Sequence, residues 1–201
     1  MMLKTSALSL LGMATATLLV GAGVEAPAAM AAGSQTSARY YLPSGYRDFP
    51  AGSDSLEASL LDPGTIGLCN IGFGDVSIAS WDDTVLGHVD LFCGDSASGY
   101  IHIRDGDGSL NDIGHEADWQ DVVDSFGGGL WDDFMLYATG EAIVSDKAPD
   151  DHGNDKLCFT TPIDIYTSDG TYITTYQPTV IVSANNKSVV TSYPTHFQSD
   201  C

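Results

Sequence analysis

The amino-acid sequence predicts an α+β fold with two helices packed on an antiparallel β-sheet meander, an N-terminal β-rich segment and disulfides. Three observations lead to this prediction: short apolar segments broken by glycines, then two helical segments, then a last third that alternates with the period of a β-strand. Helices that follow strands in this way usually pack on one face of the sheet. The chain has 201 residues, 43% of them hydrophobic, which is enough for one domain with a core.

The N-terminal region has the pattern of an export signal. Lys4 precedes the apolar run "ALSLLGMATATLLVGAGV", and Ala29, Met30 and Ala31 form a small-residue triplet. A membrane anchor is the alternative, but Gly, Thr and Ala dilute the run, and no second apolar stretch of spanning length follows. We therefore expect residues 1–31 to be a signal peptide and the mature protein to be secreted, without a membrane association.

The domain is expected to start after an irregular segment. Residues 32–64 carry Ser, Gly, Pro and Tyr without sustained periodicity, which predicts an arm or linker, and residues 65–201 then form a single α+β domain. Within the domain, "TIGLCNIGFGDVSIAS" at 65–80 and "TVLGHVDLF" at 84–92 are predicted strands. The segment "SGYIHIR" at 98–104 alternates polar and apolar side chains, which predicts a strand with one polar face.

The two expected helices lie in the middle of the chain. The first is "HEADWQDVVDSF" at 115–126, which three glycines end, and the second is "LWDDFMLYATGEAIVS" at 130–145. Apolar residues recur at helical spacing in the second helix, at Trp131, Phe134, Ala138 and Ala142.

Four strand-like segments follow the helices and complete the meander. They are "KLCFTTPIDIYT" at 156–167, "TYITTY" at 171–176, "TVIVSA" at 179–184 and "KSVVTSYP" at 187–194. Ser-Asp-Gly and Ala-Asn-Asn turn signals join them, as expected for antiparallel hairpins.

The cysteine count favours disulfides. Four cysteines are an even number, which suits an oxidising compartment, and none shows the close C-x-x-C spacing that a structural zinc site usually needs. Three pairings are possible. We expect Cys69 with Cys93, because they flank neighbouring strand-like segments, and Cys158 with Cys201, a pair that would tether the C-terminal tail.

The charge balance limits the partners. Against 27 acidic residues the chain has 7 basic ones, a formal net charge of −20, which repels polyanions unless salt screens the repulsion. Solubility, or adaptation to salty surroundings, is the preferred explanation of this charge over a dedicated function of the carboxylates.

The segment "RDGDGSLND" at 104–112 resembles an oxygen-rich calcium loop. Asp105, Asp107 and Asn111 stand at alternate positions and a glycine permits a sharp turn. Both terminal ligand positions lack a carboxylate, so Asp112 or Glu116 would have to substitute. The alternative is an Asp- and Gly-rich surface turn without metal. Calcium is thus an optional ligand, and no cofactor is expected to be required.

Several motifs together resemble a known family. When residues 106–113 are left out, "GYIHIRD" joins "GHEADWQ" as a strand-then-helix motif with a histidine in each part, followed by "LWDD" at 130–133, "VIVSANNK" at 180–187 and "VVTSYPT" at 189–195. This pattern resembles a family of secreted actinobacterial proteins over roughly Gly87 to Thr195. The ending is also similar to the final strands of bacterial ribonuclease toxins of the barnase, EndoU, colicin and RelE-like superfamily.

The resemblance implies metal-independent RNA cleavage by 2'-hydroxyl attack. One imidazole would remove the hydroxyl proton, another would protonate the leaving oxygen, and a lysine would offset developing negative charge. The corresponding residues here are His102, His115, Lys187, Thr191, Ser192 and Tyr193. Arg104 and Trp119 are the expected substrate contacts. RNA and a cognate immunity or inhibitor protein are the implied partners.

A different class of function fits the same residues. Each of them has an ordinary structural role available, such as a hydrogen-bonded histidine or a tyrosine at the edge of the core. The acidic insertion and the lack of a basic surface also oppose nucleic-acid binding. The alternative is therefore a non-enzymatic extracellular binding or inhibitory domain on the same scaffold, with calcium as a stabiliser of the acidic loop.

Overall fold

The protein is described from a computed structural model that covers residues 38–42, 61–196 and 198–201. The expected signal peptide at 1–31 and most of the expected arm at 32–64 lie outside the described residues. The elements follow in the order β1 (Ala38–Tyr41), α1 (Pro63–Asn70), β2 (Ser77–Asp83), β3 (Gly87–Phe92), α2 (Tyr100–Asp105), α3 (Glu116–Phe126), α4 (Trp131–Ile143), β4 (Asp150–Gly153), β5 (Lys156–Phe159), β6 (Ile163–Tyr166), β7 (Tyr172–Ser183) and β8 (Ser188–Thr195).

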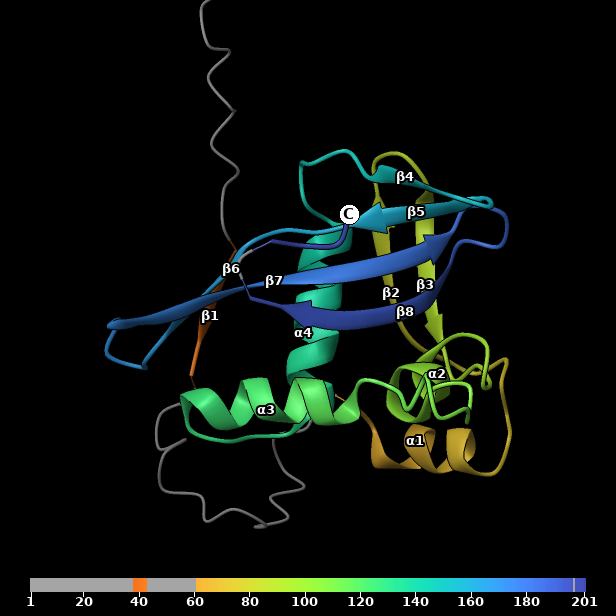
Figure 1. The fold of residues 1–201 in the computed structure, drawn as a ribbon, viewed down its shortest axis with the longest axis horizontal. Coiled ribbons are helices and arrows are strands. Elements are labelled where there is room, and N and C mark those ends of the chain that lie inside the picture. The colour runs from red at the N-terminus through yellow and green to blue at the C-terminus, as the bar shows by residue number, and fades with distance from the viewer. Residues whose placement is uncertain (1–37, 43–60, 197) are drawn as a thin grey trace, which may run out of the picture. The chain divides into compact units, whose positions relative to one another are not determined.

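The described strands form one curled, eight-stranded sheet, which confirms the α+β class (Figure 1). Its main order is β1-β6-β7-β8-β3-β2, and β5 joins β7 while β4 extends from β5. The long strand β7 pairs with β6 along its first part, with β5 along its last part, and with β8, always antiparallel. The expected meander is thus present, and its two middle segments are one continuous strand.

Two parallel pairings add to the meander. β1 pairs with β6 from Ala38↔Ile163 to Tyr41↔Tyr166, and β3 meets β8 at Asp90↔Ser188. The segment expected to be irregular therefore contains a sheet strand over Ala38–Tyr41.

The prediction of two helices was wrong, because the described residues contain four. α1 begins where a strand was expected: Asp62 caps it by accepting a hydrogen bond from the Thr65 N–H at 2.8 Å, and Pro63 stands in the first turn. The segment expected as a polar-faced strand is helix α2, which buries Tyr100 and Ile103, three residues apart. A six-residue segment fits both the periodicity of a strand and that of a helix, and here packing against the core selects the helix.

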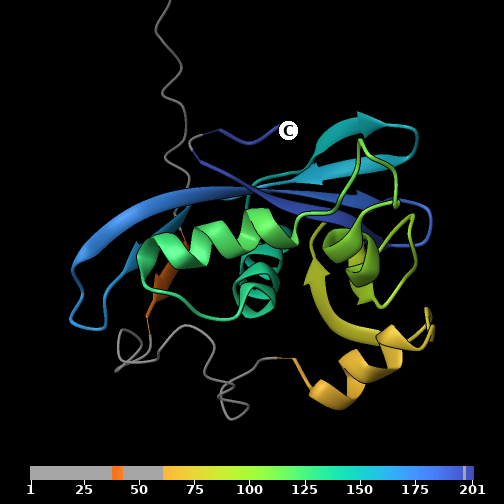
Figure 2. The same cartoon turned by 60° about the horizontal axis from the view of Figure 1, so that its bottom comes forward.

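The core lies between the sheet and helices α3 and α4. α4 contacts β2, β7 and β8, while α3 packs against α4 and β8 (Figure 2). The four apolar residues predicted to line one face of α4 are all buried. On β2, Trp81 packs so closely on α4 that a Cβ added to Gly140 would stand 2.4 Å from its indole nitrogen.

Both expected disulfides are confirmed. Cys69 of α1 bonds to Cys93 just after β3, and Cys158 of β5 bonds to Cys201. The second bond fixes the chain that follows β8 to the sheet. Among the described residues, no helix has both the length and the apolar character needed to cross a membrane.

Candidate functional site

The structure brings together two of the residues implied in catalysis, His115 and Tyr193. Their ring centroids are 4.8 Å apart, with an interplanar angle of 30°. His115 directly precedes α3, and its Nδ1 lies 3.0 Å from a carboxylate oxygen of Asp118. Because a carboxylate accepts, Nδ1 is the donor in this bond, so Nε2 of the neutral ring is the atom that can take up a proton.

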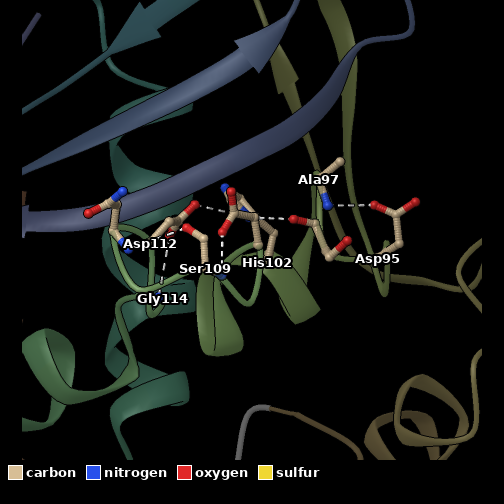
Figure 3. A network of polar contacts seen from close by, with 9 residues as sticks. Asp95, Ala97, His102, Ser109, Asp112 and Gly114 are labelled. Carbon is tan, nitrogen blue, oxygen red and sulfur yellow. Dashed lines mark hydrogen bonds and ion pairs between the residues drawn. The ribbon is translucent and has the colours of Figure 1, made fainter.

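His102 is held elsewhere, in a polar network at α2. Its Nδ1 lies 3.0 Å from the Ser96 carbonyl oxygen, to which it donates, and 3.9 Å from the Asp112 carboxylate. Figure 3 shows His102 between the loop of Asp112 and the turn that carries Asp95 and Ala97. These contacts give His102 a role in fastening two loops.

Lys187 is remote from His115. It lies in the turn before β8, beside Gly87, whereas Tyr193 is near the other end of that strand. At roughly 3.3 Å per residue the two are about 20 Å apart. The lysine expected to offset phosphate charge is therefore not beside the histidine.

Two other implied site residues, Ser192 and Trp119, are buried in the core, whereas Thr191 is only partly buried. Ser192 is 0% exposed, and its Oγ lies 2.8 Å from Oγ1 of Thr139 on α4. Trp119 is 1% exposed and donates its indole N–H to the Ser192 carbonyl oxygen. Oγ1 of Thr191 is buried without a hydrogen bond to the described residues.

Arg104, an expected substrate contact, connects two helices. Its guanidinium donates two hydrogen bonds to Asp105, at 2.9 and 2.7 Å, and a third to Asn70 of α1 at 2.7 Å. It also lies over the ring of Tyr100. The hydrogen bonds from Arg104 lower the pKa of Asp105. These contacts brace α1 against α2.

The proposed calcium ligands make protein hydrogen bonds. Asp105 accepts from Arg104, Asp107 from the Ser109 N–H at 2.7 Å, and Asp112 from the Gly114 N–H at 3.3 Å. The bonds of Asp107 and Asp112 are the local bonds of Asp-rich turns. The neighbouring Asn111 donates its own N–H to the Ser109 hydroxyl. Within the described ranges, no three His, Cys, Asp or Glu side chains converge as a metal site.

A groove of about 500 Å³ opens next to His115, between α3, the end of β8 and the chain after it. Its charged and aromatic lining consists of three carboxylates and three rings, Asp118, Asp121, Asp200, Tyr176, Tyr193 and His196. No Lys or Arg is among the described residues that line it. The groove therefore has a negative potential, which attracts cations.

Two pairs of rings shape the groove. Tyr193 packs on His115, and Tyr176 packs on His196 with centroids 4.6 Å apart. The Tyr176 hydroxyl also lies 2.8 Å from Oγ of Ser125 on α3. The groove walls are thus fixed to both the helix and the sheet.

The third carboxylate, Asp200, is positioned by the chain around it. Its N–H donates to Oγ1 of Thr179 at 2.9 Å, and the next residue, Cys201, is bonded to Cys158. Partial burial, together with a hydrogen bond to Asp200, raises the pKa of Tyr193 to about 12. Tyr193 is therefore a neutral hydroxyl donor at physiological pH.

Sequence reasoning did not single out most of the groove. Asp118, Asp121 and Ser125 recur at helical spacing on α3, a signal that was available in the segment 115–126. Asp200 and His196 come from the chain beyond the last expected strand, and no local pattern places them near α3.

Comparison of the chain with known protein families, curated proteins and solved structures found no match.

Proposed function

We propose that the protein is an extracellular binding domain whose acidic groove takes basic side chains of a partner protein. One observation carries the proposal: three carboxylates and two tyrosines line a single groove that has no lysine or arginine among its described lining residues. Its volume of about 500 Å³ falls in the range of ordinary ligand pockets.

The chemistry of the groove suits Lys and Arg. Carboxylates such as Asp121 and Asp200 form charge-assisted hydrogen bonds with guanidinium and ammonium groups. The partly exposed ring of Tyr193 attracts the same cations, by about 0.5–2 kcal/mol. The net charge of −20 would also accelerate the encounter with a basic partner.

A metal-independent ribonuclease is the second candidate, because Asp118 orients His115, which packs on the ring of Tyr193, as a general base would be oriented. The distance to Lys187 and the three carboxylates weigh against it, since a phosphate would enter the groove without a cationic partner.

Binding of a labelled Lys- and Arg-rich peptide, measured by fluorescence anisotropy, tests the proposal. A Glu-rich peptide of equal length is the control ligand. We expect only the basic peptide to bind, and Asp121→Asn and Asp200→Asn each to weaken binding about fivefold, or ~1 kcal/mol. Asp75→Asn is the matched control, because it removes the same charge outside the groove and should leave the affinity nearly unchanged.

Two results would reject the binding proposal. Equal weakening by Asp75→Asn would mean that net charge, and not the groove, attracts the peptide. Cleavage of RNA by the oxidised protein that His115→Ala abolishes, without peptide binding, would instead establish the ribonuclease. The RNA assay is run over a series of salt concentrations, because salt screens the repulsion between the acidic protein and RNA. An absence of cleavage at high salt then cannot be due to this repulsion.

A further inference from the structure

Three tyrosines stand side by side on one face of the sheet, away from the groove. Tyr41 of β1 is paired with Tyr166 of β6, which is paired with Tyr172 of β7. The first two rings are stacked with centroids 5.2 Å apart, and the third meets Tyr166 edge-on at 5.8 Å. Tyr41 is 50% exposed and Tyr172 is 54% exposed. Such large exposed aromatics in a cluster need an explanation beyond folding.

A polar row runs beside the aromatic one. Arg39, Asp164 and Thr175 are the paired residues of the same three strands. Thr175 donates its hydroxyl to the Asp164 carboxylate at 2.6 Å, and the Arg39 guanidinium lies 6.0 Å from the centroid of the Tyr166 ring. The Tyr172 hydroxyl is 2.8 Å from Oγ1 of Thr175, so the two rows are connected. We call the six residues of both rows the tyrosine platform.

The platform lies on the face of these strands that points away from the core. Side chains alternate between the faces of a strand, and the alternate residues Tyr40, Ile163 and Ile165 belong to the core. Tyr40 packs on Phe126 of α3 and Phe134 of α4. Both helices lie on one side of the β7 ribbon (Figure 2). Because Tyr40 packs on these helices, the alternate residues of the platform face the opposite side of the strands.

We propose that the tyrosine platform binds a neutral polysaccharide chain. The C–H faces of sugar rings are apolar and pack on exposed aromatic rings, here Tyr41 and Tyr172 at the two ends of the row, while the sugar hydroxyls both donate and accept hydrogen bonds. Asp164 accepts and Arg39 donates, so the polar row offers a sugar both kinds of partner. A net charge of −20 repels acidic glycans, which leaves neutral chains as the ligand.

The polar row argues against a proline-rich peptide as the occupant. Proline has no N–H, so such a peptide offers few donors to the Asp164 carboxylate. Sugar hydroxyls offer a donor on nearly every ring carbon. The same aromatic row therefore fits a glycan better than a polyproline helix.

Affinity electrophoresis of the oxidised protein in native gels tests the platform. The gels contain hydroxyethylcellulose, xylan or dextran, and a gel without polysaccharide gives the reference mobility. We expect at least one polysaccharide to retard the protein. Tyr41→Ala and Tyr172→Ala should each require at least a tenfold higher polysaccharide concentration for the same retardation. Phe73→Ala is the matched control, because Phe73 is an aromatic residue that is 55% exposed outside the platform, and it should be retarded like the wild type.

Three outcomes overturn the proposal. The first is the absence of retardation by all three polysaccharides for a protein whose circular dichroism shows that it is folded. The second is an equal loss of retardation in Phe73→Ala. The third is binding of a proline-rich peptide in place of the glycans. The platform is separate from the acidic groove, so binding of a basic peptide should be unchanged in Tyr41→Ala. The two proposals can therefore fail independently.

Discussion

The indole N–H of Trp119 donates a hydrogen bond to the carbonyl oxygen of Ser192 at 3.0 Å. This bond joins α3 to β8 inside the core. His115 lies one turn before Trp119, whose backbone N–H bonds to the His115 carbonyl, and Tyr193 follows Ser192. The buried bond therefore sets how His115 and Tyr193 meet at the edge of the groove.

Replacing Trp119 with Phe should destabilise the protein by about 2–4 kcal/mol. The substitution removes the donor to the Ser192 carbonyl oxygen and leaves a cavity where the larger ring packed on Phe134. Urea unfolding followed by fluorescence or circular dichroism measures the loss. A change below about 0.5 kcal/mol would show that this bond and packing do not hold α3 to β8.

The hydroxyls of Ser192 and Thr139 should behave as one buried pair. Ser192→Ala leaves the Thr139 hydroxyl with only its weak contact to the Met135 sulfur, and should cost about 1–3 kcal/mol. The double variant with Thr139→Val should cost less than the sum of the two single changes. A double-mutant cycle by urea unfolding checks this. Strict additivity would contradict the pairing.

A methyl group at position 140 should be unfavourable although alanine is the better helix former. The Cβ of Gly140→Ala would meet the indole of Trp81, so we expect a destabilisation of about 1–3 kcal/mol. Gly67→Ala in α1 is the matched control, because its Cβ meets nothing within 4 Å. This control should stabilise by about 0.5–1 kcal/mol. Thermal unfolding of both variants would reveal opposite shifts.

Asp132 should make stability depend on pH. Burial raises the pKa of Asp132 in the folded protein, and repulsion from Asp133 adds to the shift. The folded state then holds this proton more tightly than the unfolded state, so stability falls as pH rises from the unfolded value through the folded pKa. Asp132→Asn should therefore raise the melting temperature at pH 7.

The stabilisation by Asp132→Asn should shrink as the pH falls towards about 4, where the carboxyl is increasingly protonated in both states. Thermal scans of both proteins between acidic and neutral pH test this dependence. A constant difference across the series would mean that the ionisation of Asp132 is not its cause.

Several elements were predictable because their signals are local. The glycines after Phe126 end α3, the apolar spacing in 130–145 identifies α4, and hairpin signals mark the turns that flank β7. The cysteine pairs were predictable from the even number of cysteines and from the neighbouring strand-like segments that Cys69 and Cys93 flank. The helix at Pro63 also had a local signal, since Asp62 before a proline is a common helix start.

The remaining errors concern arrangements that only the whole chain decides. The residues Tyr100 to Asp105 fit either a strand or a helix, and burial of two side chains against the core selects the helix. His115 and Tyr193 meet in the groove, but Lys187 does not, because it stands at the far end of the strand that carries Tyr193. Motif order in a sequence does not reveal such distances along a strand.

The parallel pairing of β1 with β6 has a consequence for how the molecule is assembled during synthesis. Ala38 leaves the ribosome long before its partner Ile163, so β1 has to wait while all four helices and the strands β2 to β5 are made. Until then Phe126 and Phe134 lack the cover of Tyr40, and the platform lacks Tyr41 and Arg39. Docking of β1 is thus a late step in folding, slowed by the length of the loop it must close.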